Sequence, residues 1–125
     1  MIYLEALPLN CPPETAVEVT TVTSVYRLIA KGSPEMEDFR SHRALYPAKR
    51  YPNECIARGL SVFRNESDAE SMLLLKKFLG KGVCRVKLSP NAGRLTQQKS
   101  NHNSHSTWWP YATFDILSNC ESFKA

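Results

Sequence analysis

Two spacings of hydrophobic residues run along this chain, and each predicts a different kind of element. Between Glu18 and Ile29 the residues are rich in β-branched side chains and alternate between apolar and polar, which is typical of a strand or a hairpin edge. The same alternation predicts strands over residues 59–64 and 83–88, and shorter strands over residues 94–98 and 111–117.

One segment has helical spacing instead. Asn65 is a favourable N-cap, and Gly80 supplies the left-handed residue that commonly ends a helix. Between them the apolar side chains form one broad helical face, made of Ala69, Met72, Leu73, Leu75 and Leu79. This pattern predicts a helix over residues 66–79 that packs against the strands on either side of it. Shorter helical segments are predicted from Pro34 to about His42 and around residues 54–57.

Many strands with few helices predict an α+β domain rather than alternating α/β units. The length suits a single small domain over residues 1–125, with a mixed or antiparallel sheet, the main helix at 66–79, and one or two short helices. Residues 1–16 contain three prolines and are expected to form an irregular arm. Residues 99–107 are polar and are expected to form a mobile loop.

Composition narrows the class of protein only slightly. Hydrophobic residues make up 42% of the chain, as in ordinary globular proteins, so most of the chain is expected to fold. No apolar run reaches the roughly 18 residues of a membrane span, and the first residues lack the features of a signal peptide. We therefore expect a cytoplasmic protein that does not enter a membrane. The four cysteines are widely spaced, without a CxxC pair, so we expect four free thiols.

The net charge of +4 permits an anionic ligand without requiring one. Basic residues gather over residues 40–50 and are mixed with Tyr46 and Tyr51. Interleaved basic and aromatic side chains are typical of nucleic-acid binding, but a solvated loop that packs its tyrosines on the domain also accounts for them. Both interpretations stay open.

Three side chains on two predicted strands are candidates for a binding site. Arg27 shares a strand face with Val25 and Ile29, so its guanidinium must meet an internal carboxylate, solvent, or an anionic ligand such as a phosphate. Ser61 lies on the opposite face from its apolar neighbours, together with Phe63. A hydroxyl beside an aromatic ring suits the floor of a nucleotide pocket, although a solvent-facing serine gives the same pattern.

Further candidates lie in the polar segments. Ser41 and His42 end the first short helix; they do not face each other on a helix, but His42 can act across a cleft. Trp108 and Trp109 are adjacent, so in an extended segment one indole is expected to be exposed and able to stack on a ligand, unless both pack as a structural corner. His105 lies close to them and is a candidate for proton transfer near neutral pH.

No metal site is expected. His102 and His105 have HxxH spacing, but zinc needs three or four ligands and nothing in the sequence fixes a third. The glycine-rich phosphate-binding motifs and the GxSxG motif of serine hydrolases are also absent from the sequence.

Two family resemblances rest on these motifs. The segments DFRS (38–41), RGLSVF (58–63) and HSTWWP (105–110) resemble a group of small bacterial proteins, which implies no mechanism. The order of VYRL (25–28), GLSVF (59–63), a helix and CRVKL (84–88) is similar to that of the ADP-ribosyltransferase family. This second resemblance implies that Arg27 contacts the phosphate or ribose of NAD and that Ser61 helps to set the nicotinamide side. It also implies that Phe63 or a tryptophan stacks on the ring. The late Glu-x-Glu pattern of that family is missing here.

Three functional hypotheses result. The first is an NAD- or nucleotide-binding, ADP-ribosyltransferase-like domain, with NAD as its cofactor and Arg27, Ser61 and His105 as catalytic residues. Its substrate-binding residues are then Phe63, Trp108, Trp109, Ser41 and His42. The second is a non-enzymatic interaction protein, such as an antitoxin or immunity-type partner, which suits the small size and the expected exposed aromatic residues. The third is a nucleic-acid-binding module.

Overall fold

The computed structural model of this chain describes residues 1–97 and 104–124. Its strands are β1 (Val17–Glu18), β2 (Thr23–Ile29), β3 (Leu60–Phe63), β4 (Gly82–Leu88), β5 (Gly93–Gln97), β6 (His105–Pro110) and β7 (Cys120–Lys124). Its helices are α1 (His42–Leu45), α2 (Glu54–Ala57) and α3 (Glu66–Met72), with short 3-10 segments η1 (Met36–Phe39), η2 (Lys76–Phe78) and η3 (Leu117–Asn119). The fold is therefore mainly β, and the prediction of an α+β domain with a main helix is wrong.

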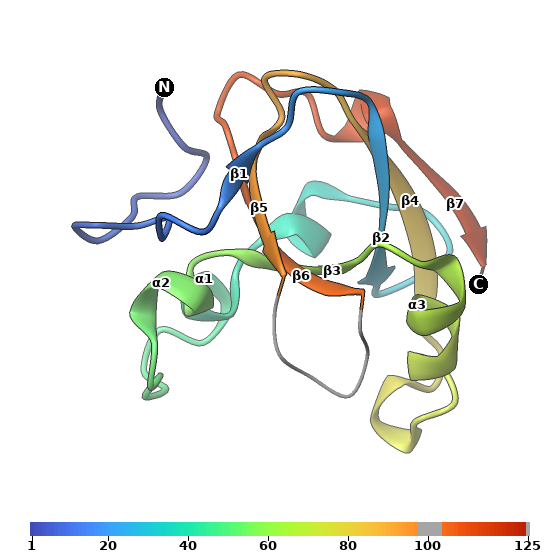
Figure 1. The fold of residues 1–125 in the computed structure, drawn as a ribbon. Helices are drawn as coiled ribbons and strands as arrows, with labels where there is room; N and C mark the ends of the chain where they lie inside the picture. Colours follow the sequence, from blue (N-terminus) through green and yellow to red (C-terminus); the bar gives the residue numbers. More distant parts are fainter. Residues whose placement is uncertain (98–103, 125) are drawn as a thin grey trace.

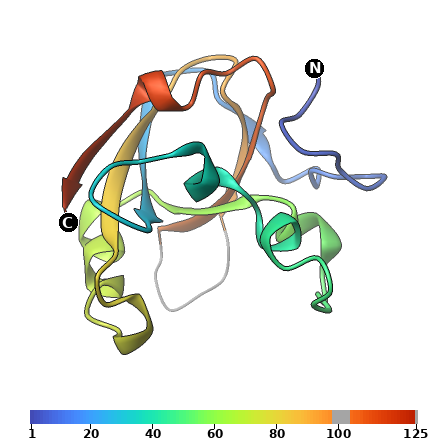
Figure 2. The ribbon, with the colours of Figure 1, turned by 180° about the vertical axis from the view of Figure 1, so that it is seen from behind.

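The strands form one antiparallel sheet with the order β1-β5-β6-β3-β2-β4-β7. The pairing of β2 with β4 runs from Thr23 to Ile29, whereas β2 and β3 pair only at Tyr26 and Phe63. The sheet is therefore splayed between β3 and β2. Figures 1 and 2 show the result: the half with β5, β6 and β3 lies across the half with β2, β4 and β7.

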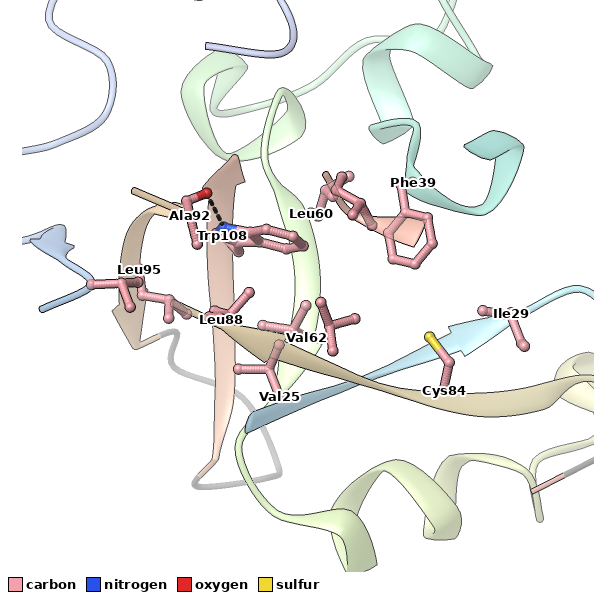
Figure 3. Close-up of a cluster of buried hydrophobic side chains, with 13 residues drawn as sticks. Val25, Ile29, Phe39, Leu60, Val62, Cys84, Leu88, Ala92, Leu95 and Trp108 are labelled. Carbon is pink, nitrogen blue, oxygen red and sulfur yellow. Dashed lines mark hydrogen bonds between the residues drawn. The ribbon is translucent and has the colours of Figure 1, made fainter. Parts of the chain in front are cut away.

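The main core lies between these two halves, as Figure 3 shows. Alternate residues of the strands point into it, which is what a sheet with one buried face requires. Trp108 is its largest side chain and is fully buried, with its indole N–H donating to the carbonyl of Ala92 at 3.1 Å. The other members include Val25, Ile29, Phe39, Leu60, Val62, Val86, Leu88 and Leu95.

The predicted strands at 59–64 and 83–88 are confirmed as β3 and β4. They run parallel to each other, but β2 lies between them and is antiparallel to both. β3 and β4 are therefore not direct neighbours in the sheet. Each of them pairs with β2, which comes from an earlier part of the sequence.

The predicted helix over residues 66–79 ends early, at Met72. Its first part packs Ala69, Met72 and Leu73 against a second apolar cluster that includes Phe63 and Val83. Short helices depend on such packing for their stability, and Leu75 already has an extended backbone. The leucines after it lie outside the core, with Leu74 83% and Leu79 68% exposed.

The predicted strand over residues 111–117 is also wrong. Tyr111 forms a single bridge with Tyr3, and the chain then turns before β7 begins at Cys120. Within the segment expected to be a polar loop, residues 99–103 lie outside the described residues, and His105 to Thr107 form the start of β6. Among the described residues, none of the helices has the length and apolar character needed to cross a bilayer.

A disulfide joins Cys11 to Cys55, so the prediction of four free thiols is wrong. The two cysteines are 44 positions apart in the sequence, and their Cα atoms lie 5.5 Å apart. The bond fastens the N-terminal arm to α2, which neither local spacing nor composition reveals. Cys84 and Cys120 are free thiols, the first buried and the second partly buried.

The exposure of Leu79 gives a first testable contrast. Leu60→Ala removes a buried side chain and should lower the free energy of unfolding by about 2–5 kcal/mol. Leu79→Ala removes an exposed one and should change it by less than about 0.5 kcal/mol. Urea denaturation measures both values. Equal losses for the two variants would contradict the observed end of α3.

The disulfide gives a second prediction. Cys11→Ser or Cys55→Ser should lower the free energy of unfolding by about 2–4 kcal/mol, because the unfolded chain gains freedom when the loop is opened. Alkylation of the unfolded, non-reduced protein followed by mass spectrometry should label only Cys84 and Cys120. Labelling of all the cysteines without a reductant would show that the bond does not form.

Candidate functional site

A hollow of about 490 Å³ lies on the outer face of β3 and β6. This face is the one opposite the main core, because Leu60, Val62 and Trp108 point into the core between the positions that line the hollow. Its lining residues come from these two strands, from α1 and α2, and from the loop before α2: His42, Tyr51, Pro52, Asn53, Ile56, Ala57, Gly59, Ser61, His105 and Thr107. The volume falls within the range of about 300–1,000 Å³ that is usual for small-molecule sites.

Ser61 and His105 form the polar floor of this hollow. The Oγ atom of Ser61 lies 2.6 Å from Nε2 of His105, a hydrogen bond between neighbouring strands. The His105 ring stacks on Phe63, with ring centroids 5.3 Å apart and planes inclined by 28°. Strand register explains the grouping, since Phe63 is opposite His105 and Ser61 is opposite Thr107. Ser61 and Phe63 therefore lie on one face of β3, as predicted. The imidazole of His105, on the neighbouring strand β6, lies on the same face.

Gly59 keeps the end of the floor open. A Cβ atom at this position would lie 2.2 Å from Cγ2 of Thr107 and 3.1 Å from the indole of Trp109. Any larger residue would push these side chains apart and displace the strand pair that carries Ser61 and His105. The glycine is thus required by close packing.

His42 contributes a second imidazole to the same hollow. It is the first residue of α1, whose N-cap is Ser41: the Ser41 hydroxyl accepts a hydrogen bond from the Ala44 N–H and donates one to Glu5. Ser41 is 1% exposed, so it positions His42 and does not reach a ligand itself. Partial burial lowers the pKa of His42 below its ordinary value, and the positive charges of Arg27 and Lys49 lower this pKa further. His42 is therefore neutral at pH 7 and can accept a proton.

Arg27 lies behind the site and binds the backbone. Its guanidinium donates to the carbonyl oxygens of Ser61 at 2.7 Å and Asp38 at 2.8 Å, with a longer contact of 3.5 Å to Arg40. The ring of Phe39 lies 5.9 Å from the guanidinium carbon. Burial lowers the pKa of Arg27 to about 10, so the side chain stays charged at pH 7. Its partners are main-chain carbonyls rather than the ligand or carboxylate expected from the sequence.

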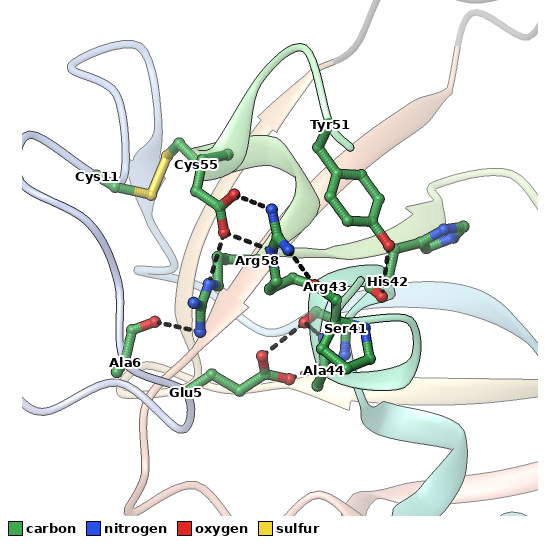
Figure 4. A network of polar contacts seen from close by, with 12 residues as sticks. Glu5, Ala6, Cys11, Ser41, His42, Arg43, Ala44, Tyr51, Cys55 and Arg58 are labelled. Carbon is green, nitrogen blue, oxygen red and sulfur yellow. Dashed lines mark hydrogen bonds and ion pairs between the residues drawn. A yellow bond between two sulfur atoms is a disulfide. The ribbon is translucent and has the colours of Figure 1, made fainter. Parts of the chain in front are cut away.

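A network of polar contacts holds α1 against α2, as Figure 4 shows. Glu54 accepts hydrogen bonds from Arg43 at 2.5 and 2.9 Å and from Arg58 at 2.9 Å. These contacts keep the pKa of Glu54 below its usual range. Arg58 also donates to the carbonyl of Ala6, and the disulfide joins the arm to α2 close by. The wall of the hollow that carries His42 is thereby fixed to the N-terminal arm.

Both tryptophans are structural. Trp108 is fully buried in the core, and Trp109 is 1% exposed with its indole N–H donating to the Cys55 carbonyl at 3.0 Å. Neither indole lines the hollow. Both indoles are packed inside the protein, which is the second of the two arrangements that the sequence allows. The aromatic side chain that does line the hollow is Tyr51.

Positive charges lie near one wall of the hollow. None of the described residues that line it is acidic, and Arg27 and Lys49 both lie close enough to depress the pKa of His42. Among the described residues, no group of three or more His, Cys, Asp and Glu side chains is arranged to hold a metal ion, and His102 lies outside the described residues. The chemistry that these side chains offer is proton transfer by two imidazoles and hydrogen bonding by Ser61, Thr107 and Asn53.

The structure brings His42, Ser61 and His105 to one hollow, with Phe63 beneath His105 and Arg27 behind Ser61. Sequence reasoning did not assign Tyr51, Asn53 or Thr107 to a site with Ser61 and His105. The alternation of β6 could have indicated Thr107, which is two residues after His105. The sequence indicated Tyr51 only as part of the basic and aromatic segment and did not indicate Asn53, because the loop that carries them is placed by long-range contacts.

Comparison with known proteins finds no matching family model, no matching curated protein and no matching solved structure.

The pKa of His42 gives a third prediction. Its midpoint, followed by NMR of the ring protons, should lie below 6.5, and Lys49→Ala should raise it because one repelling charge is removed. The unfolded chain binds this proton more readily than the folded chain, so the contribution of His42 lowers folding stability as the pH falls through 6.5 and below. Lys76→Ala, which removes a lysine in η2, is the control and should leave the midpoint unchanged.

Proposed function

We propose that this chain binds an anionic nucleotide of the NAD type in the hollow over β3 and β6, as an ADP-ribosyltransferase-like domain. The observation that carries the proposal is the 2.6 Å hydrogen bond between Ser61 and His105 on the floor of a hollow that also receives His42. A hydroxyl and two imidazoles around one space are suited to orienting a ribose or phosphate and to moving a proton.

The arrangement of the strands supports the proposal. Arg27, Ser61 and His105 lie on β2, β3 and β6, which are neighbours in the sheet. They form a continuous chain of contacts, from the guanidinium to the Ser61 carbonyl and from the Ser61 hydroxyl to the imidazole. The resemblance to ADP-ribosyltransferases implies an arginine and a serine on successive early strands. In this chain the arginine acts on the strand that carries the serine and supplies positive charge behind it.

The residues present fit a ligand with a phosphate and a ring. The positive charge of Lys49 near His42 suits the phosphates, and Thr107 and Asn53 suit hydroxyl or amide groups of the ligand. Tyr51, Pro52 and Ile56 give an apolar wall on which a ring can lie. NAD, when bound, supplies an electrophilic ribose carbon whose bond to nicotinamide is weak. Neutral His42 is suited to take the proton of an incoming hydroxyl group.

Late carboxylates do not contribute to this site. Asp115 accepts hydrogen bonds from Ser118, and Glu121 pairs with Arg85; neither lines the hollow. The proposed activity therefore depends on imidazoles in place of the glutamate of the ADP-ribosyltransferase family. Nucleotide binding without transfer of ADP-ribose is the simpler form of the same proposal.

The disulfide bears on where the protein acts. Disulfides persist in oxidising compartments and are rare in the cytoplasm. We propose on this ground an oxidising location for the protein rather than the cytoplasmic one expected from the sequence.

Thermal unfolding in the presence of NAD, ADP-ribose, AMP and nicotinamide tests the proposal. NAD at about 100 times its dissociation constant should stabilise the protein by about 2.7 kcal/mol, and His105→Ala should abolish most of this stabilisation because the ligand loses its main polar contact. Ser61→Ala should weaken it as well. NAD consumption, measured by the release of nicotinamide, then separates binding from turnover.

Ser122→Ala is the matched control for the serine variant, since Ser122 is exposed on β7 and does not line the hollow. It should leave the stabilisation by NAD unchanged. The proposal fails if none of the nucleotides stabilises the wild-type protein, or if His105→Ala responds to them as the wild type does.

A further inference from the structure

The basic segment at residues 40–50 is only partly neutralised by acidic side chains. Arg40 pairs with Glu37, and Arg43 pairs with Glu54. Lys49 and Arg50 are exposed, and neither takes part in an ion pair within the part of the chain that the structure describes. Two adjacent positive charges are thus left for a partner from outside.

These two charges lie at the edge of the proposed nucleotide site. Lys49 is close enough to His42 to disfavour protonation of the imidazole. Arg50 directly precedes Tyr51 and Pro52, which line the hollow. Lys49 and Arg50 therefore belong to the exposed segment that leads directly into the lining of the hollow.

Tyr51 is held in a fixed orientation at the same edge. Its hydroxyl donates to the carbonyl of His42 at 2.7 Å and also lies 3.1 Å from the carbonyl oxygen of Tyr46. The guanidinium carbon of Arg43 lies 4.6 Å from its ring centroid. The guanidinium covers one side of the ring, and the ring also contributes to the wall of the hollow. A fixed aromatic ring beside positive charges is the combination that binds an unpaired base next to its phosphates.

We propose that the surface formed by Lys49, Arg50 and Tyr51 binds single-stranded nucleic acid, whose strand ends or loops into the hollow beside His42. Lys49 and Arg50 hold successive phosphates, and an unstacked base lies against Tyr51. A duplex does not fit this description, because its bases are paired and stacked and cannot reach a tyrosine at the mouth of a hollow. The inference rests on the proposed function in one respect: it makes the strand the macromolecular substrate of the nucleotide site.

Fluorescence anisotropy with labelled oligo-U and oligo-dT of about 12 nucleotides measures the binding. The variant Lys49→Ala/Arg50→Ala should bind both strands at least about tenfold more weakly than the wild type. In a plot of log affinity against log salt concentration, the slope for this variant should be less steep than that of the wild type by about 1.4, because two phosphate contacts are lost. Tyr51→Leu should weaken binding without changing the salt slope.

Lys76→Ala/Lys77→Ala is the matched control, because it removes the same charge from an exposed pair in η2. That segment follows α3 and lies apart from α1 and α2 in both views of the fold (Figures 1 and 2). The control should bind oligonucleotides as the wild type does. An equal loss in both double variants would mean that only net charge matters, and would overturn the inference. Tighter binding of a poly-glutamate peptide than of the strands would also overturn it, in favour of an acidic protein partner.

The two proposals fail separately. If NAD stabilises the protein but the oligonucleotides do not bind at about 100 mM salt, the nucleotide site stands and this inference is overturned. If the strands bind through Lys49 and Arg50 but no mononucleotide or dinucleotide stabilises the protein, the nucleic-acid surface stands and the NAD-type site is rejected.

Discussion

The guanidinium of Arg27 occupies the point where the sheet parts, and the arrangement of the candidate site depends on it. β2 and β3 pair at a single position, so the edge of β3 needs another partner for its polar groups. Arg27 supplies it by donating to the Ser61 carbonyl, and it binds the Asp38 carbonyl with the same side chain. One charged group thus fixes β3 and the segment that leads to His42. The guanidinium stays charged at pH 7, so a positive charge lies behind the hollow.

The opposite wall of the hollow relies on contacts between segments that are too short to be stable alone. α1 and α2 are each a single helical turn, and isolated helices of that length do not persist in water. Ser41 and Asn53 cap them, Glu54 joins them through two arginines, and the disulfide attaches α2 to the arm. His42, Tyr51 and Asn53 therefore keep their places because of the N-terminal residues, which do not line the hollow themselves.

The electrostatics of the site distinguish it from one built around a carboxylate. Two imidazoles and a hydroxyl face a space that has no acidic lining residue among those described, with fixed positive charges at its back and at its edge. These features are the basis for proposing an anionic ligand. In the proposed function, proton transfer falls to the imidazoles, because no carboxylate lines the hollow among the described residues. The nucleotide proposal and the nucleic-acid surface both follow from this one property.

The sequence by itself determined β2, β3, β4 and β5, the N-terminal part of α3, and the faces on which Arg27, Ser61 and Phe63 lie, because strand alternation and capping are local. It singled out Ser61, His105 and His42, but gave no distance between them. The tertiary structure alone decided that α3 ends at Met72, that both tryptophans are buried, that Cys11 meets Cys55, and that Arg27 binds carbonyls. Each of these outcomes depends on which distant segment covers a given surface, and no local pattern of residues carries that information.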